Sequence, residues 1–179
     1  MKDMDVQREA AALRFRKGER LRLRTLVEQL FAKGDSLFEW PLRAVARPLG
    51  ADALGAMFKG HVPAGTGRLQ MLVTVPKRRR RHAVDRVLMR RRIREAWRLN
   101  RAGLRAAVGS AGEVRTFSVA FIYLADKNVG YPKVEQSMKR LLAKMEKRYF
   151  PLTSSWSICP TSGDRLSRLL FRLSPITKT

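Results

Sequence analysis

The segment KRRRRHAVDRVLMRRRIREAWRLNR, residues 77–101, constrains this chain more than any other part of it. Apolar side chains recur in it at helical spacing, and arginines fill the positions between them. At about 100° per residue, one face of the expected helix collects Met89, Ile93, Ala96, Trp97 and Leu104. A neighbouring face collects Arg90, Arg94, Arg98, Arg101 and Arg105, with Arg91 at its margin and Arg86 between the two faces. The pattern predicts a helix that packs by its apolar face and projects a ridge of arginines.

The overall charge of the chain indicates which kind of partner such a ridge of arginines would bind. The chain has 38 Lys and Arg against 15 Asp and Glu, a net charge of +23, so a polyanionic partner would relieve its self-repulsion. Nucleic acid and an anionic membrane surface both meet that requirement. A charged face that is only solvated usually mixes signs, whereas residues 77–101 contain only two acidic residues, Asp85 and Glu95. Arginine also favours bidentate phosphate contacts and stacking on bases. These features favour nucleic-acid contact over a solvated face.

Other classes of protein fit the sequence less well. No apolar run approaches the ~20 residues that a membrane-spanning helix needs, and the first residues lack the apolar core of a secretory signal. The single cysteine, Cys159, and the two histidines, His61 and His82, exclude a disulfide framework and a Cys/His zinc site. A Cys–His nucleophile is formally available, but Cys159 lies in a tail rich in Ser, Thr and Pro, which favours a bystander thiol. We expect a cytoplasmic protein without a metal site of its own.

The remaining patterns predict one α+β domain at residues 15–150, an α/β sandwich in which helices pack a small mixed sheet. We expect, in order, a helix in residues 19–36, a strand at 41–47, a loop at 48–68, a strand at 69–75, the basic helix, a strand at 116–125 and a helix at 131–150. The element order is α-β-β-α-β-α. Pro41 begins the first strand, which suits a sheet edge. Strand 116–125 is apolar on both faces, which suits the centre of the sheet.

Two extensions flank this domain. Residues 1–14 mix charges and are rich in alanine, as in a frayed helix. Residues 151–179 turn to Ser, Thr and Pro, and then place leucines at helical spacing opposite arginines: Leu166, Leu169, Leu170 and Leu173 against Arg165, Arg168 and Arg172. A docked or frayed helix fits this pattern, and so does a short basic amphipathic helix that attaches to RNA or to a membrane surface.

The run TVPKRRRRHAVDRVLMRRRIREAWRLN, residues 74–100, resembles the basic motif of the protein subunit of bacterial ribonuclease P. In that family a strand and a short basic loop lead into a helix of the form A-V-x-R-N-R-x-K-R-x-x-R-E-A-[FYW]-R. The matching positions include Arg86, Arg90, Arg91, Arg94 and Glu95. Val87 and Leu88 stand where the family has Asn and Arg, and Pro76 where it usually has Ser. The flanking elements also look like the family's, so the resemblance covers roughly residues 15–148.

The resemblance implies a ribosomal-protein S5 domain 2-like fold and a role in tRNA processing. Ribonuclease P removes the 5′ leader of precursor tRNA by endonucleolytic cleavage, and in bacteria its RNA subunit holds the catalytic Mg²⁺. The resemblance therefore implies no catalytic residue and no tightly bound cofactor in this chain. It implies a protein monomer bound one-to-one to ribonuclease P RNA, with precursor tRNA as the second partner and no membrane.

The same resemblance assigns two groups of RNA-binding residues. The basic loop and helix would contact the RNA subunit through Lys77, Arg78, Arg79, Arg80, Arg81, Arg86, Arg90, Arg91, Arg94 and Arg98. A cleft between the first helix and the sheet would hold the single-stranded leader through Phe31, Arg43, Lys77, Arg86 and Arg90. A leader of variable sequence calls for backbone contacts and sequence-tolerant stacking.

Some aromatic side chains fit two interpretations. Phe31 matches a leader-contacting aromatic of the family, yet an aromatic on an apolar helix face is equally consistent with core packing. Val27 stands where many relatives have a second aromatic, which weakens stacking there. Trp97 has apolar neighbours and is predicted to be core, whereas Trp40, beside Pro41, is predicted to be more exposed.

Two other functions share part of the pattern. A ribosomal or ribosome-associated RNA-binding protein would have the charge and the sandwich without requiring the motif of residues 74–100. A stand-alone protein nuclease would need a cluster of metal-binding carboxylates, and the sequence has no such cluster.

Overall fold

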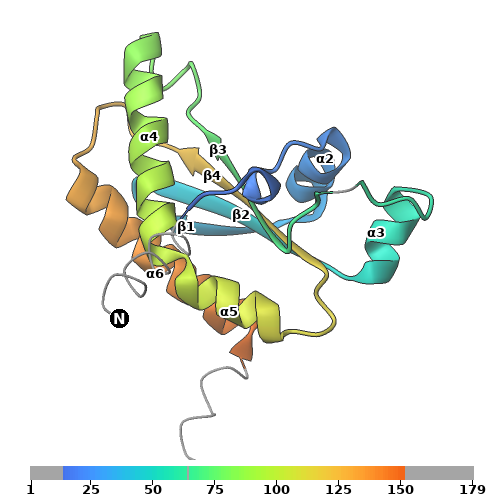
Figure 1. Ribbon diagram of the computed structural model, residues 1–179. Helices are drawn as coiled ribbons and strands as arrows, with labels where there is room; N and C mark the ends of the chain where they lie inside the picture. The colour runs from blue at the N-terminus through green and yellow to red at the C-terminus, as the bar shows by residue number, and fades with distance from the viewer. Residues whose placement is uncertain (1–13, 64, 152–179) are drawn as a thin grey trace, which may run out of the picture.

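A mixed four-stranded sheet lies at the centre of the computed structural model, which describes residues 14–63 and 65–151 (Figure 1). The elements in chain order are η1 (Lys17–Glu19), α2 (Arg24–Lys33), β1 (Asp35–Glu39), β2 (Leu42–Leu49), α3 (Ala51–Met57), β3 (Leu69–Thr74), α4 (Ala83–Asn100), α5 (Ala102–Ser110), β4 (Thr116–Tyr123) and α6 (Tyr131–Tyr149). Each helix and strand predicted within residues 15–150 is present, although the helix predicted at 19–36 spans only Arg24–Lys33, so the predicted α+β class is confirmed. The elements β1, α3 and α5 add to the predicted order.

The sheet has the strand order β1-β2-β4-β3. β1 and β2 form an antiparallel hairpin, β2 and β4 are antiparallel, and β3 and β4 are parallel. All residues of β4 except Ile122 are buried, as expected for an apolar strand with both faces covered. The predicted central position of residues 116–125 is confirmed.

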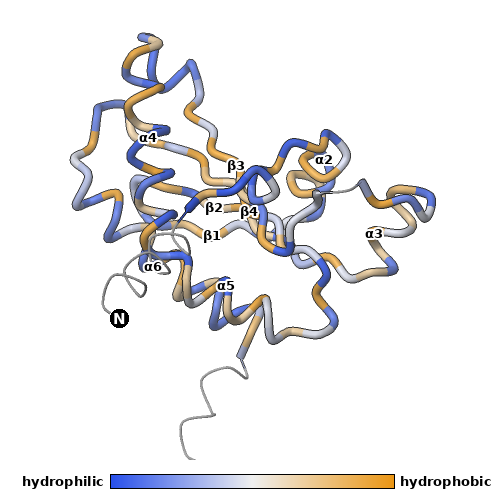
Figure 2. The backbone as a smooth tube through the Cα atoms, viewed as in Figure 1, coloured by the Kyte–Doolittle hydropathy of each residue, from blue (hydrophilic) through white to orange (hydrophobic). Residues whose placement is uncertain are grey.

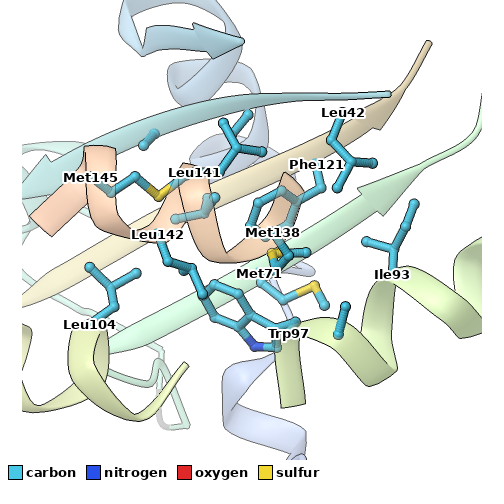
Figure 3. Close-up of a cluster of buried hydrophobic side chains, with 14 of the residues drawn as sticks. Leu42, Met71, Ile93, Trp97, Leu104, Phe121, Met138, Leu141, Leu142 and Met145 are labelled. Carbon is cyan, nitrogen blue, oxygen red and sulfur yellow. The ribbon is translucent and has the colours of Figure 1, made fainter. Parts of the chain in front are cut away.

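One face of the sheet is covered by α4, α5 and α6, and α4 lies beside α6 (Figure 1). Trp97 of α4 is 1% exposed and meets Phe121 of β4 edge-on, with ring centroids 5.4 Å apart. Met138 and Leu142 of α6 belong to the same buried cluster (Figure 3). The prediction that Trp97 is core is therefore confirmed, and its burial fixes α4 on the sheet.

The opposite face is covered by α2 and α3. Leu26 and Leu30, one helical turn apart on α2, share a buried cluster with Val45 of β2 and Ala120 of β4. Leu54 of α3 completes this cluster. The two apolar clusters therefore lie on opposite sides of the sheet, and α2 and α4 come from different sides.

The strand predicted at residues 41–47 does not lie at a sheet edge. β1 occupies that edge, and β2 lies between β1 and β4. The pattern missed β1 because its two large apolar residues, Leu37 and Phe38, are adjacent and point to opposite faces, so no alternation marks a strand. Pro41 lies in the turn before β2, where it interrupts no pairing of that strand.

The predicted loop at residues 48–68 contains a helix. Pro48 and Leu49 extend β2, and α3 follows at Ala51–Met57. Its alanines favour helix, but Gly50 and Gly55 give the segment the composition of a loop. Leu54 anchors α3 because it is fully buried.

The predictions for the extensions, with Cys159 and the leucine repeat of residues 166–173, fall outside the described residues. Within residues 14–63 and 65–151, none of the helices has the length and apolarity to cross a membrane.

Candidate nucleic-acid interface

The buried side of α4 matches the predicted apolar face, since Met89, Ile93, Ala96 and Trp97 are all buried. Figure 2 shows α4 alternating between hydrophobic and hydrophilic residues along its length. The helix ends at Asn100, so Leu104, although buried, belongs to α5 instead. The apolar stripe therefore sets which arginines of α4 face outward.

Several arginines of the basic loop are used inside the protein. Arg79 Nη1 donates to both carboxylate oxygens of Asp126, at 3.0 and 3.1 Å. Arg80 pairs with Asp85 and donates to the carbonyl oxygen of Asp126 at 2.6 Å. The pKa of Asp85 is lowered by a hydrogen bond from Asn128 and by the positive charge of Arg80. These bonds tie the loop before α4 to the loop after β4.

Arg86 and Arg92 bind backbone carbonyl groups. Arg86 Nη1 donates to the carbonyl oxygens of Arg80 and Arg81, at 3.0 and 2.5 Å, and so holds the loop against the first turn of α4. Arg92 Nη1 donates to the carbonyl oxygen of Val129 at 2.6 Å. Much of the arginine content of residues 79–92 therefore fixes the position of the loop.

A second set of cations makes no ion pair within the described residues: Lys77, Arg78, Arg81, Arg90, Arg91 and Arg94. All of them except Arg90 are exposed. Although Arg94 is exposed overall, the pKa of its guanidinium is lowered by partial desolvation and by the nearby charges of Arg90 and Arg20. We call this set the ridge cations. Their mutual repulsion marks a place where an anion is favoured.

Arg98 and Arg101 differ from the predicted ridge. Arg98 pairs with Glu95 at 2.6 Å, which raises the pKa of Arg98 and lowers that of Glu95. Arg101 is 2% exposed, and its guanidinium donates to Glu19 at 2.5 Å and to the carbonyl oxygen of Arg14 at 2.9 Å. The prediction that Arg101 projects from the ridge is wrong, because the break between α4 and α5 turns it inward onto η1.

An open strip crosses the other face of the sheet. Cross-strand register places Phe38, Arg43, Ile122 and Thr74 in one row over all four strands. Phe38 is 56% exposed, and Arg43 is exposed and donates from Nε to Ser36 Oγ at 2.6 Å. The row combines an exposed aromatic with a cation. The sequence pattern missed Phe38 because β1 itself was not recognised.

The structure places Phe31 on the surface of α2, 47% exposed, so the core interpretation does not hold for it. Val27, one turn earlier, is half-buried against the cluster beneath α2. Phe31 and Arg43 come from the side of the sheet that α2 covers, whereas Arg86 and Arg90 come from α4 on the other side. Two of the five predicted leader residues therefore lie on each side of the sheet, and Lys77 lies in the loop between the edge strand β3 and α4.

A shallow depression runs along that edge strand. It has a volume of about 330 Å³ and is lined by Phe15, Arg20, Leu21, Arg22, Met71, Leu72, Val73 and Arg94. At this depression, the segment before α2 pairs with β3 through one isolated β-bridge, between Arg20 and Met71. The depression joins the ridge cations to Arg20 and Arg22, which the sequence pattern had not singled out.

Acidic and sulfur-bearing side chains do not gather into a metal site in the described part of the chain, where no group of three His, Cys, Asp or Glu side chains is placed to hold an ion. Its carboxylates instead pair with arginine and lysine, as Asp85, Asp126 and Glu95 do. Residues 14–63 and 65–151 therefore offer no such group of ligands for a protein-held Mg²⁺ ion.

The family model of ribonuclease P matches residues 15–146. The chain belongs to the ribonuclease P protein family. It is 33% identical over 129 residues to the ribonuclease P protein component of Porphyromonas gingivalis, which is 72% of this chain and 84% of that protein. A second strain of that species gives the same identity and coverage. Family membership implies an RNA partner and a role in a ribonuclease P complex.

Solved structures of ribonuclease P proteins are also similar. The protein of Staphylococcus aureus matches with a TM-score of 0.49 and 14% identity, over 72% of this chain and 95% of that chain. The protein of Thermotoga maritima matches with a TM-score of 0.48 and 21% identity, over 70% of this chain and 96% of that chain.

Proposed function

We propose that this chain is the protein subunit of ribonuclease P, and that it binds the catalytic RNA subunit and the 5′ leader of precursor tRNA to assist 5′ maturation of tRNA. The observation that carries this proposal is the set of ridge cations. Their neighbours Arg79, Arg80 and Arg98 have acidic partners, whereas the ridge cations have none within the described residues. A polyanion would supply the negative charge that balances these six cations.

We assign binding of the RNA subunit to the ridge cations. Guanidinium groups on one side of a helix can contact successive phosphates, and each contact releases condensed counterions. Val87 and Leu88 are also exposed on α4. They replace the family's Asn and Arg with apolar groups, so the phosphate contacts in this part of the helix fall to Arg90, Arg91 and Arg94.

The leader is assigned to the open strip and the adjoining flank of α2. Phe38 and Phe31 offer exposed aromatic faces on which bases of any sequence can stack. Arg43 lies next to Phe38 in the row and carries a charge for the backbone. Lys77 follows β3 shortly after Thr74, at the end of the same row.

Bond cleavage is assigned to the RNA subunit, because the described residues offer no cluster of carboxylates placed to hold a metal ion. Mg²⁺ held by that RNA would supply the nucleophile and stabilise the leaving group. This chain's residues act electrostatically: the ridge cations reduce repulsion between two RNA molecules and so favour their association. We place this one-to-one complex in the cytoplasm.

Reconstitution tests the proposal. Purified protein is added to a bacterial ribonuclease P RNA at low Mg²⁺, and removal of the leader from precursor tRNA is measured. We expect the rate to rise and to saturate at one protein per RNA, because the protein reduces repulsion that Mg²⁺ would otherwise screen. Protein without RNA should cleave nothing.

A variant with Arg90, Arg91 and Arg94 changed to Gln should need more protein for the same rate. A charge control changes Lys59, Arg115 and Lys147 to Gln, three exposed cations outside the ridge and the strip, and should behave like the wild type. A wild-type protein that binds ribosomal RNA as tightly as ribonuclease P RNA, and does not accelerate leader removal, would reassign the chain to the ribosomal class.

A further inference from the structure

A pocket of about 320 Å³ lies apart from the row of the open strip, between η1 and the loop that precedes β3. Its lining comes from segments that are distant in the sequence: Lys17, Gly18, Arg20, Arg22, Leu23, Pro63, Gly65, Thr66 and Gln70. This volume is at the lower end of the range for small-ligand sites. It suits one nucleotide and is too small for a duplex.

Three cations border the pocket. Lys17, Arg20 and Arg22 are exposed, and none has an acidic partner in the part of the chain that the structure describes. Glu19 lies among them in sequence, but its carboxylate is engaged by Arg101 at 2.5 Å and faces Arg105 at 3.8 Å. The rim of the pocket is therefore positive, and an anionic group would be stabilised there.

Gln70, one of the lining residues, carries a buried acceptor without a partner among the described residues. Gln70 is 3% exposed, and its Nε2 donates to the carbonyl oxygen of Gly18 at 3.3 Å. Its Oε1 is buried and accepts no hydrogen bond from the described residues. A buried acceptor left unpaired is unfavourable, so a ligand that donates a hydrogen to Oε1 would remove that penalty.

Glycines build the wall of the pocket. A Cβ atom on Gly67 would lie 2.5 Å from the carbonyl oxygen of Gly18, so no larger residue fits without a backbone shift. Gly65 has a φ of +94°, in the region that glycine adopts at little cost. The hydroxyl of Thr66 donates to the carbonyl oxygen of Pro63 at 2.9 Å. The loop is thus held against η1 by backbone contact and leaves the side of the pocket open.

We propose that this pocket binds one nucleotide of single-stranded RNA, with Lys17, Arg20 and Arg22 around its phosphate and Gln70 Oε1 accepting from the amino group of its base. The proposal rests on the proposed function, since it takes RNA as the partner. Adenine, cytosine and guanine carry an exocyclic amino group, and uracil carries none. A pocket that accepts from the amino group therefore favours these three bases over uracil, whose base offers only the ring N3–H as a donor, whereas stacking on the open strip does not discriminate.

Two sources supply such a nucleotide: the leader and a single-stranded stretch of the RNA subunit. The depression along β3 shares Arg20 and Arg22 with this pocket and reaches Arg94 of the ridge. A strand bound at the ridge can therefore continue into the pocket, and the two sources are separated by experiment.

The first test compares labelled hexamers of cytidine and uridine, which have rings of the same size. Fluorescence anisotropy should show the wild type binding the cytidine hexamer about tenfold more tightly. Gln70→Met keeps the approximate shape of the side chain and removes both the Oε1 acceptor and the Nε2 donor to Gly18. It should bind both hexamers with the affinity that the wild type shows for uridine. Equal wild-type affinities, or a preference that survives in Gln70→Met, would overturn the proposal.

The second test does not depend on a buried substitution. Arg20→Gln with Arg22→Gln should make the slope of log K against log salt shallower by up to about 0.7, since both arginines lie around one phosphate and each phosphate neutralised on a single strand contributes ~0.7. Arg115→Gln with Lys147→Gln removes the same charge elsewhere and should leave the slope near that of the wild type. If both double variants change the slope equally, net charge and not the pocket is responsible.

The two sources are then distinguished with the Arg20→Gln, Arg22→Gln variant. Weaker binding of the RNA subunit alone would place that RNA in the pocket, and weaker binding only of leader-bearing tRNA would place the leader there. Unchanged binding of both would reject the pocket while leaving the proposed function intact. A wild-type protein that fails to activate ribonuclease P RNA would reject the proposed function instead.

Discussion

Arg80 and Arg81 are neighbours in the sequence but lie in different surroundings. Arg80 is held by Asp85 and by the carbonyl oxygen of Asp126, whereas Arg81 is exposed and has no acidic partner among the described residues. A run of arginines therefore overstates the number of cations that RNA can use, because some of them build the surface that presents the others.

This difference predicts opposite effects for two adjacent substitutions. Arg80→Gln should lower the melting temperature, because it leaves Asp85 without its cation, and Arg81→Gln should lower only the affinity for the RNA subunit. The carboxylate of Asp85 has a lowered pKa, so its stabilising effect is present above the unfolded-state pKa and is lost as pH falls through the folded-state pKa. The melting-temperature gap between Arg80→Gln and the wild type should therefore narrow in acid. A gap that does not change with pH would contradict the role of this pair.

Phe31 is exposed enough to test without disturbing the core. Phe31→Leu removes the aromatic face, and base stacking is worth ~1–3 kcal/mol per base. We expect binding of precursor tRNA by the reconstituted complex to weaken by about tenfold, which corresponds to ~1.4 kcal/mol. Binding of mature tRNA, which has no leader, should change little. Equal losses for both ligands would show that Phe31 acts through folding or through the RNA subunit.

At the scale of elements, α4 has a packed side and a ridge side, and substitutions separate the two. Trp97→Ala should destabilise the fold by ~3–5 kcal/mol, since it removes a buried aromatic. Changing Arg90, Arg91 and Arg94 to Gln should leave the denaturation midpoint near that of the wild type and weaken binding to the RNA subunit. Similar midpoints for the two variants would contradict this assignment of faces.

The elements that the sequence predicted correctly are those with sustained apolar spacing. α4, β4 and α6 each bury a continuous stripe or a whole strand, and local periodicity is enough to identify them. β1 was missed because its two adjacent apolar residues show no alternation, and α3 was missed because it is short and its glycines resemble those of a loop. Local spacing could not show the roles of Gln70 and Arg101, because both depend on contacts with η1, which is distant from them in the sequence.

The position of η1 depends on a buried ion pair. Glu19 accepts from Arg101, whose guanidinium also lies 5.7 Å from the ring centroid of Phe15. Glu19→Gln removes the carboxylate that pairs with this buried guanidinium, and removing one partner of a buried pair costs ~3–5 kcal/mol. Hydrogen exchange should show faster exchange at Leu21, whose amide donates to Met71 across the same junction. Unchanged exchange at Leu21 would mean that the bridge to β3 alone holds this segment.

At the scale of the whole molecule, a net charge of +23 raises the question of whether RNA responds to the total charge or to its placement. The described acidic residues are largely occupied by ion pairs within the domain. The excess positive charge is therefore available to a partner, and binding to the RNA subunit should weaken steeply as salt rises.

A matched pair of variants tests whether the total charge or its placement determines binding to the RNA subunit. Changing Lys77, Arg78 and Arg81 to Gln removes three loop cations, and changing Lys59, Arg115 and Lys147 to Gln removes three cations elsewhere. If the loop cations contact phosphates directly, the slope of log K against log salt should become shallower by about 2–2.7, at ~0.7–0.9 per phosphate. The second variant keeps those contacts and should retain a slope close to that of the wild type, with only a small uniform loss of affinity. Equal changes in slope would show that the RNA subunit responds to net charge, and the interface assigned to the loop would then have to be abandoned.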